Sequence, residues 1–163
     1  METKQLKIIF LDVDGVLNNS KTEDRVGFFL GLNDGLVKRL KKIVDATGAE
    51  IYLISTWKER WYKENDKKKY QDAFADRLDV VFCNYGLKIA DKLEDEDINP
   101  VARGRLVKEF FKTANADSFV ILDDCEFDYY YENLGDNLVQ TNSKYGLTEK
   151  DVKKAIEILN KSN

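Results

Sequence analysis

The sequence predicts a single α/β domain in which helices cover both faces of a parallel sheet, a three-layer, Rossmann-like arrangement. Strand-length apolar runs alternate with segments of helical period along the whole chain. The 163 residues suffice for one domain, and one proline and nine glycines leave no room for a flexible linker. The three most apolar runs each end in hydroxyl or carboxyl side chains. We therefore expect residues 1–163 to form one domain.

The first half of the chain predicts two buried strands with a helix between them. Residues 6–11 are nearly all apolar, which is typical of a strand buried on both faces of a sheet. A helix then begins after Asn33, a suitable N-cap, and ends at Gly48, with apolar residues at helical spacing between them. Residues 51–54 predict the second buried strand.

The second half predicts six further elements. The first three are a charged helix over residues 57–78, a short strand over 80–82 and a helix over 106–111. A third strongly apolar strand over 119–122, a last strand over 138–139 and a final helix from Thr148 follow. Thr148 and Asp151 form a near match to a capping box. Segment 58–102, about 45 residues, is below the usual size of a domain, so we expect a small insertion within the single domain.

Composition excludes several classes of chemistry. The chain contains no histidine, which excludes Ser-His-Asp triads, a histidine general base and histidine-containing zinc sites. Its two cysteines cannot form a disulfide scaffold or a cysteine-only zinc site. A net charge of −4 argues against unspecific coating of nucleic acid. The N-terminus lacks a signal-peptide pattern and no apolar run could cross a bilayer, so we expect a cytoplasmic protein without a membrane partner.

Carboxylates and hydroxyls follow the three apolar strands, and these side chains are Asp12 and Asp14, Ser55 and Thr56, Asp123 and Asp124. Each pair by itself is compatible with a turn or a helix cap. Parallel strands place all of them at one sheet edge, where crowded carboxylates repel one another unless a cation lies among them. Oxygen ligands without histidine or cysteine favour Mg²⁺. Segment 123–136 holds six acidic residues and no basic one, so an anionic substrate would need metal charge to enter.

Four segments resemble the motifs of the haloacid dehalogenase (HAD) superfamily phosphatases. Residues 10–18 (FLDVDGVLN) resemble the first motif, and Ser55 is similar to the phosphate-binding hydroxyl of the second. Arg103 opens a segment that resembles the basic third motif, and residues 120–124 (VILDD) resemble the acidic fourth. The small, capless HAD domains of RNA-repair proteins are the most similar subgroup, on three further features: Ser55-Thr56-Trp57, Arg103-Gly104 and residues 145–148.

The resemblance implies a phosphatase mechanism that uses two carboxylates. Asp12 is expected to attack phosphorus and form an aspartyl-phosphate. Asp14 is expected to protonate the leaving alcohol and then to deprotonate the water that cleaves the intermediate. Mg²⁺ would be held by Asp12, the Asp14 backbone carbonyl and the acidic pair, with Asp124 as the direct ligand and Asp123 behind it or sharing the site.

The phosphate-binding residues implied by the resemblance are Ser55, Thr56 and a basic third-motif residue. That residue is usually lysine; here either Arg103 fills the position or Lys108 does, one helical turn later. Residues 16–32 are too few for a helical cap domain. The open site would admit a large phosphorylated substrate, such as a nucleic-acid end, or a small one such as a nucleotide.

Two questions stay open on the sequence alone. Segment 58–69 carries six basic and three acidic residues with interleaved aromatics, which fits either a solvated amphipathic helix or a stacking surface for a polynucleotide end. The chain is also compatible with a receiver-like module or a catalytically silent phosphate- and Mg²⁺-binding module on the same scaffold. The motif order, with Asp12-x-Asp14 first and the acidic pair last, disfavours a receiver.

Overall fold

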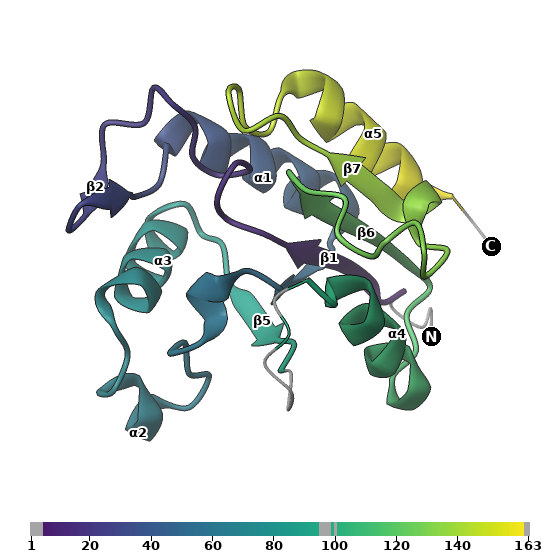
Figure 1. Ribbon diagram of the computed structural model, residues 1–163, viewed down its shortest axis with the longest axis horizontal. Helices are drawn as coiled ribbons and strands as arrows, with labels where there is room; N and C mark the ends of the chain where they lie inside the picture. The colour runs from purple at the N-terminus through teal and green to yellow at the C-terminus, as the bar shows by residue number, and fades with distance from the viewer. Residues whose placement is uncertain (1–4, 95–98, 100, 162–163) are drawn as a thin grey trace.

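A five-stranded parallel sheet forms the centre of the computed structural model, which describes residues 5–94, 99 and 101–161 (Figure 1). Its strand order is β5-β4-β1-β6-β7. The strands are β1 (Lys7–Leu11), β4 (Glu50–Leu53), β5 (Ile89–Lys92), β6 (Ser118–Asp123) and β7 (Leu138–Gln140). The predicted α/β, Rossmann-like parallel sheet is confirmed.

Helices cover both faces of this sheet, α1 (Asp34–Thr47) and α5 (Glu149–Asn160) on one and α4 (Arg103–Thr113) on the other (Figure 1). The central strand β1 serves both layers because successive side chains point to opposite faces. Ile9 and Leu11 belong to the core that contains the apolar faces of α1 and α5. Ile8 and Phe10 belong to the second core, which α4 closes.

The predicted helix ends are confirmed for α1 and α5. The Asn33 side chain accepts a hydrogen bond from the Leu36 N–H, and Gly48 ends α1 with a φ of 67°, a left-handed conformation that glycine adopts readily. Thr148 and Asp151 form a complete capping box at the start of α5. These ends depend on local hydrogen bonds, which the sequence shows directly.

The predicted elements over residues 57–82 are wrong. A 3₁₀ turn, η1 (Thr56–Lys58), and two helices, α2 (Asn65–Lys68) and α3 (Ala73–Asn84), replace the single charged helix. The predicted strand 80–82 lies inside α3. Asp72 caps α3 through the N–H groups of Phe74 and Ala75, and Ala75, Leu78 and Phe82 are buried at helical spacing. Capping and burial thus outweigh the strand preference of the two valines.

Strand β5 was not predicted. It pairs with β4 at the edge of the sheet, and only its first residue, Ile89, is buried. A short edge strand with polar residues lacks the apolar pattern by which a strand is predicted from sequence. The described part of segment 58–102 therefore contributes one strand, β5, to the main sheet.

Residues 16–32 contain a small antiparallel hairpin of β2 (Arg25–Val26) and β3 (Phe29–Leu30) and no helix, which agrees with the expected minimal cap. Gly27, with a φ of 60°, begins its two-residue turn at the position where a type II′ hairpin needs positive φ. Among the described helices, none is long and apolar enough to cross a membrane.

Candidate active site

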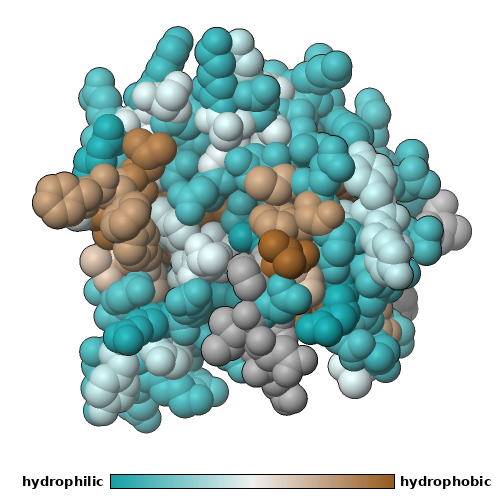
Figure 2. Space-filling view, in the orientation of Figure 1, coloured by the Kyte–Doolittle hydropathy of each residue, from teal (hydrophilic) through white to brown (hydrophobic). Residues whose placement is uncertain are grey.

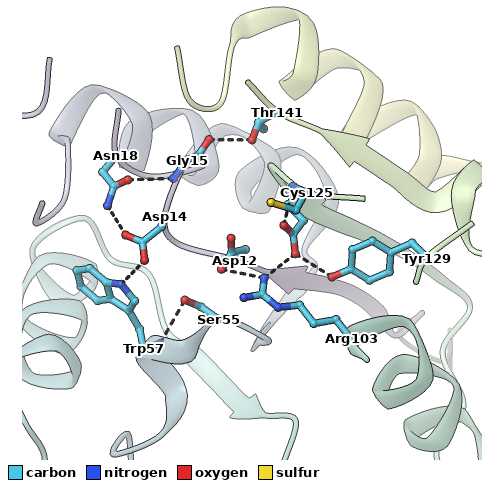
Figure 3. A network of polar contacts seen from close by, with 11 residues as sticks. Asp12, Asp14, Gly15, Asn18, Ser55, Trp57, Arg103, Cys125, Tyr129 and Thr141 are labelled. Atoms are coloured by element: carbon cyan, nitrogen blue, oxygen red, sulfur yellow. Dashed lines mark hydrogen bonds and ion pairs between the residues drawn. The ribbon is translucent and has the colours of Figure 1, made fainter. Parts of the chain in front are cut away.

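The carboxyl ends of β1, β4 and β6 bring the predicted polar residues to one edge of the sheet (Figure 3). Leu11 at the end of β1 pairs with Leu53 of β4 and Leu122 of β6, so the residues that follow these strands lie side by side. Hydrogen bonds continue past the strand ends, from the Asp12 N–H to the Leu122 carbonyl at 2.9 Å and from the Ile54 N–H to the Leu11 carbonyl at 3.0 Å. The backbone around Asp12 is therefore fixed.

A buried charge cluster consists of Asp12, Arg103 and Asp123. Their exposed fractions are 4%, 8% and 0%. Arg103 is the first residue of α4, and its Nη1 lies 3.1 Å from Asp12 Oδ1 and 2.7 Å from Asp123 Oδ2. The Phe127 ring lies 4.4 Å from the guanidinium carbon. One guanidinium thus faces two carboxylates, and the ionised cluster has one excess negative charge.

Burial dominates the protonation of this cluster. It raises the pKa of Asp12 to about 7; the Arg103 guanidinium opposes the rise, and the Asp123 and Asp124 carboxylates add to it. Burial also raises the pKa of Asp123 above its ordinary value, again against Arg103. For Arg103 burial acts to lower the pKa, but Asp12 and Asp123 outweigh it and raise the pKa, so the guanidinium stays charged.

The two acidic residues at the end of β6 have different surroundings. Asp123 Oδ2 accepts hydrogen bonds from the Tyr129 hydroxyl at 2.8 Å and from Arg103, and its Oδ1 accepts from the Cys125 N–H at 3.0 Å. Asp124 is only half-buried, and its carboxylate lies against Gly15, where an added Cβ would come within 2.3 Å of Asp124 Oδ2. Asp123 therefore supports the cluster from behind, while Asp124 borders the open side of the site.

Asp14 is exposed but both of its oxygens accept hydrogen bonds. Asn18 Nδ2 donates to Oδ1 at 2.8 Å, and Trp57 Nε1 donates to Oδ2 at 3.0 Å. The amide of Asn18 is buried; its Oδ1 accepts a hydrogen bond from the Gly15 N–H, and its Nδ2 also donates to the Gly31 carbonyl. We call Asn18 and Trp57 the Asp14 clamp. Neither residue was predicted to hold Asp14, although Asn18 and Trp57 both lie inside segments that resemble the family's motifs.

The remaining predicted site residues lie around this centre. Ser55 is fully buried, and its Oγ accepts from the Trp57 N–H at 3.3 Å, which leaves the hydroxyl proton to donate. Thr56 is exposed at the wall of the adjoining cleft. Lys108 is exposed on α4, and Arg103 is the basic residue that contacts Asp12.

The aromatic residues near segment 58–69 are divided between core and surface. Trp57 and Trp61 are buried, and Trp61 Nε1 donates to Asp79 at 2.9 Å. Tyr70 is exposed. The two tryptophans thus pack inward, as an amphipathic segment would place them, and neither presents a free stacking surface.

A family model described as HAD domain in Swiss Army Knife RNA repair proteins matches residues 8–152. The chain belongs to this HAD family. Among curated proteins, none matches the chain. Membership supports a phosphatase-type hydrolase function for the HAD domain, and HAD domains in general use Mg²⁺.

The residues present fit a magnesium ion. Carboxylate oxygens are the ligands that Mg²⁺ prefers, and Asp12, Asp123 and Asp124 supply them at one sheet edge. One potential ligand atom from each of Asp123, Asp124 and Cys125 lies within 4.8 Å of the others. Arg103 pairs with Asp12 and Asp123, and Asp124 adds a third carboxylate beside Asp123, so a divalent cation would offset the excess negative charge.

Proposed function

We propose that this HAD domain is an Mg²⁺-dependent phosphomonoester hydrolase that acts through an aspartyl-phosphate on Asp12. The observation that carries the proposal is the pairing of two differently held carboxylates at the end of β1. Asp12 is buried and contacts Arg103, while Asp14 is open to solvent and held by neutral donors. One carboxylate is placed for attack and the other for proton transfer.

The reaction has two steps. In the first, an Asp12 carboxylate oxygen forms a bond to phosphorus, the bond from phosphorus to the ester oxygen breaks, and Asp14 donates its proton to that oxygen. In the second, water attacks phosphorus, Asp14 takes up the water proton, and the bond to Asp12 breaks to release inorganic phosphate. The two steps return both carboxylates to their starting states.

The other residues bind and orient the phosphoryl group. Ser55 donates its hydroxyl proton to a phosphoryl oxygen, Thr56 lies beside it, and Arg103 supplies positive charge next to the attacking oxygen. Asp12, the Asp14 backbone carbonyl and Asp124 would hold Mg²⁺, with Asp123 supporting them. The ion, when bound, offsets negative charge on the phosphoryl group. The substrate is a nucleotide or the phosphorylated end of a nucleic acid.

The test is phosphate release from a broad panel of phosphomonoesters by the purified chain, with and without Mg²⁺. We expect release that requires Mg²⁺ and that Asp12→Asn abolishes. No release from any ester, or equal release by Asp12→Asn, would contradict the proposal. A long-lived phosphorylated Asp12 after treatment with acetyl phosphate, without turnover, would instead support a receiver-like module.

A further inference from the structure

An aromatic wall stands beside Asp14, and apart from the Trp57 N–H that holds Asp14 it has no part in the chemistry described above. It consists of Trp57, Phe74 and Phe29, from η1, α3 and the β2–β3 hairpin. The Trp57 and Phe74 ring centroids are 4.9 Å apart, and those of Phe74 and Phe29 are 5.8 Å apart. Phe29 is 67% exposed, and Figure 2 shows an apolar patch over this hairpin, at the left of the view. Phe28 is exposed beside Phe29, and an exposed apolar patch at the rim of a cleft is typical of a ligand-binding site.

This wall borders a cleft of about 720 Å³, within the usual size range of small-molecule sites. Asp14 and Asp124 also line the cleft, whereas Asp12, Ser55 and Arg103 do not. If the phosphoryl group lies among Asp12, Ser55 and Arg103, the cleft begins on the side of the residue that protonates the leaving oxygen. On the proposed mechanism, the leaving group would therefore lie in this cleft, next to Asp14.

The charge of the cleft limits what that leaving group is. The carboxylates of Asp14, Glu59, Asp72 and Asp124 line it, and no lysine or arginine does among the described residues. A ligand with further phosphates would be repelled from it, because each added negative charge faces this acidic surface. Asn19, Ser20 and Ser143 offer polar groups to hydroxyls or a base edge.

We propose that the leaving group is a single uncharged nucleoside, whose base stacks on the Phe29–Phe74 part of the aromatic wall. The proposal rests on the proposed function and narrows its substrate to a mononucleotide, in preference to the end of a polynucleotide chain. Base–aromatic stacking tolerates any base because every base has a π-face. The wall therefore selects for the presence of a base, without reading which base it is.

The experiment compares kcat/KM of the full chain with Mg²⁺ for adenosine 5′-monophosphate and ribose 5-phosphate, which share the ribose ring and the 5′-phosphate; the first carries adenine at C1′ and the second a hydroxyl. We expect adenosine 5′-monophosphate to be preferred at least about tenfold. Phe29→Leu keeps an apolar contact with Phe74 but removes stacking, and should lower this ratio toward one. Phe74→Leu should lower it too. The matched control is Phe28→Ala, because Phe28 is a fully exposed neighbour on the same hairpin that does not line the cleft, and it should keep the ratio.

A second comparison tests the charge argument with a 5′-phosphorylated trinucleotide. We expect a lower kcat/KM for it than for adenosine 5′-monophosphate. Asp72→Asn should narrow that gap, since asparagine can still cap α3, whereas Asp66→Asn, on exposed α2 outside the cleft, should not. Equal or faster hydrolysis of ribose 5-phosphate or of the trinucleotide would overturn the inference and leave the proposed function standing. Failure of every ester would overturn the proposed function itself.

Discussion

Asp12 and Asp14 lie two residues apart after the same strand, yet the protein holds them in opposite ways. Asp12 is buried and shares a guanidinium with Asp123, whereas Asp14 is exposed and accepts two hydrogen bonds from uncharged donors. The buried carboxylate is fixed and shielded from water, as a nucleophile should be. The exposed one lines the open cleft, where the proposed mechanism needs a group that protonates the leaving oxygen. This difference in surroundings is what the proposed mechanism requires, because it assigns the two carboxylates different chemical roles.

Within the buried cluster, Arg103 is the cation that pairs with both Asp12 and Asp123. Arg103→Met would leave two buried carboxylates without a cation, and we expect the free energy of unfolding to fall by about 3–5 kcal/mol. Phosphatase activity should be lost as well. Urea denaturation of the purified variant measures the first effect and phosphate release the second. Lys108→Ala is the matched control and should change neither by much; a larger effect from Lys108→Ala would show that the third-motif residue had been misassigned.

Stability should fall as pH rises, in metal-free buffer. The pKa of Asp12 is raised from 3.8 to about 7 in the folded chain, so the folded state holds a proton that the unfolded state releases. The resulting stabilisation is complete below about pH 4 and is lost as pH rises through 7. Asp12→Asn removes the excess charge and should raise the free energy of unfolding at pH 7.5 by about 1–3 kcal/mol. Denaturation between pH 4 and 8 checks this. The prediction would be contradicted if the free energy of unfolding of Asp12→Asn fell with rising pH as steeply as that of the unmodified chain.

Substitutions around the exposed Asp14 should lower the catalytic rate more than the free energy of unfolding. Trp57→Phe keeps a ring in the aromatic wall but removes the N–H that holds Asp14 Oδ2, and we expect kcat to fall about tenfold with little change in KM. Steady-state kinetics on one ester gives both constants. Phe10→Leu, a change in the second core, which contains neither residue of the Asp14 clamp, controls for general loosening of the fold. A rise in KM at constant kcat would mean that Trp57 contacts substrate and does not orient Asp14.

The smallest effect concerns the support behind Asp123. Tyr129→Phe removes the hydroxyl that donates to Asp123 Oδ2 at 2.8 Å in a fully buried place. We expect a loss of about 1–2 kcal/mol in the free energy of unfolding, because Arg103 and the Cys125 N–H still bind Asp123. Thermal or urea denaturation measures it. Tyr131→Phe, at an exposed position on the same loop, should have no effect.

The features that the sequence alone could predict are those that depend on neighbours in the chain or on the alignment of parallel strands. The strand ends that carry Asp12, Ser55 and Asp123 were predictable because each follows an apolar run, and parallel strands align their carboxyl ends. The caps at Asn33 and Thr148 were predictable because they involve neighbours in the chain. These features are local or follow from the topology of one sheet.

The features that sequence reasoning missed depend on contacts between distant segments. Trp57 reaches Asp14 only because η1 turns the chain after β4, and no pattern within either segment indicates that hydrogen bond. Helix α3 replaced a predicted strand because Asp72 caps it and its apolar face packs on the core. The choice between Arg103 and Lys108 needed the position of α4 relative to β1.

The central claim is that Asp12 becomes phosphorylated while Asp14 transfers the proton. The most direct test is a rapid acid quench during turnover with Mg²⁺ and adenosine 5′-monophosphate, or the best ester of the panel, followed by mass spectrometry of the peptide that contains Asp12. We predict one added phosphoryl group on Asp12 during turnover and none in Asp12→Asn. Phosphate release at full rate with an unmodified Asp12 peptide throughout would contradict the account.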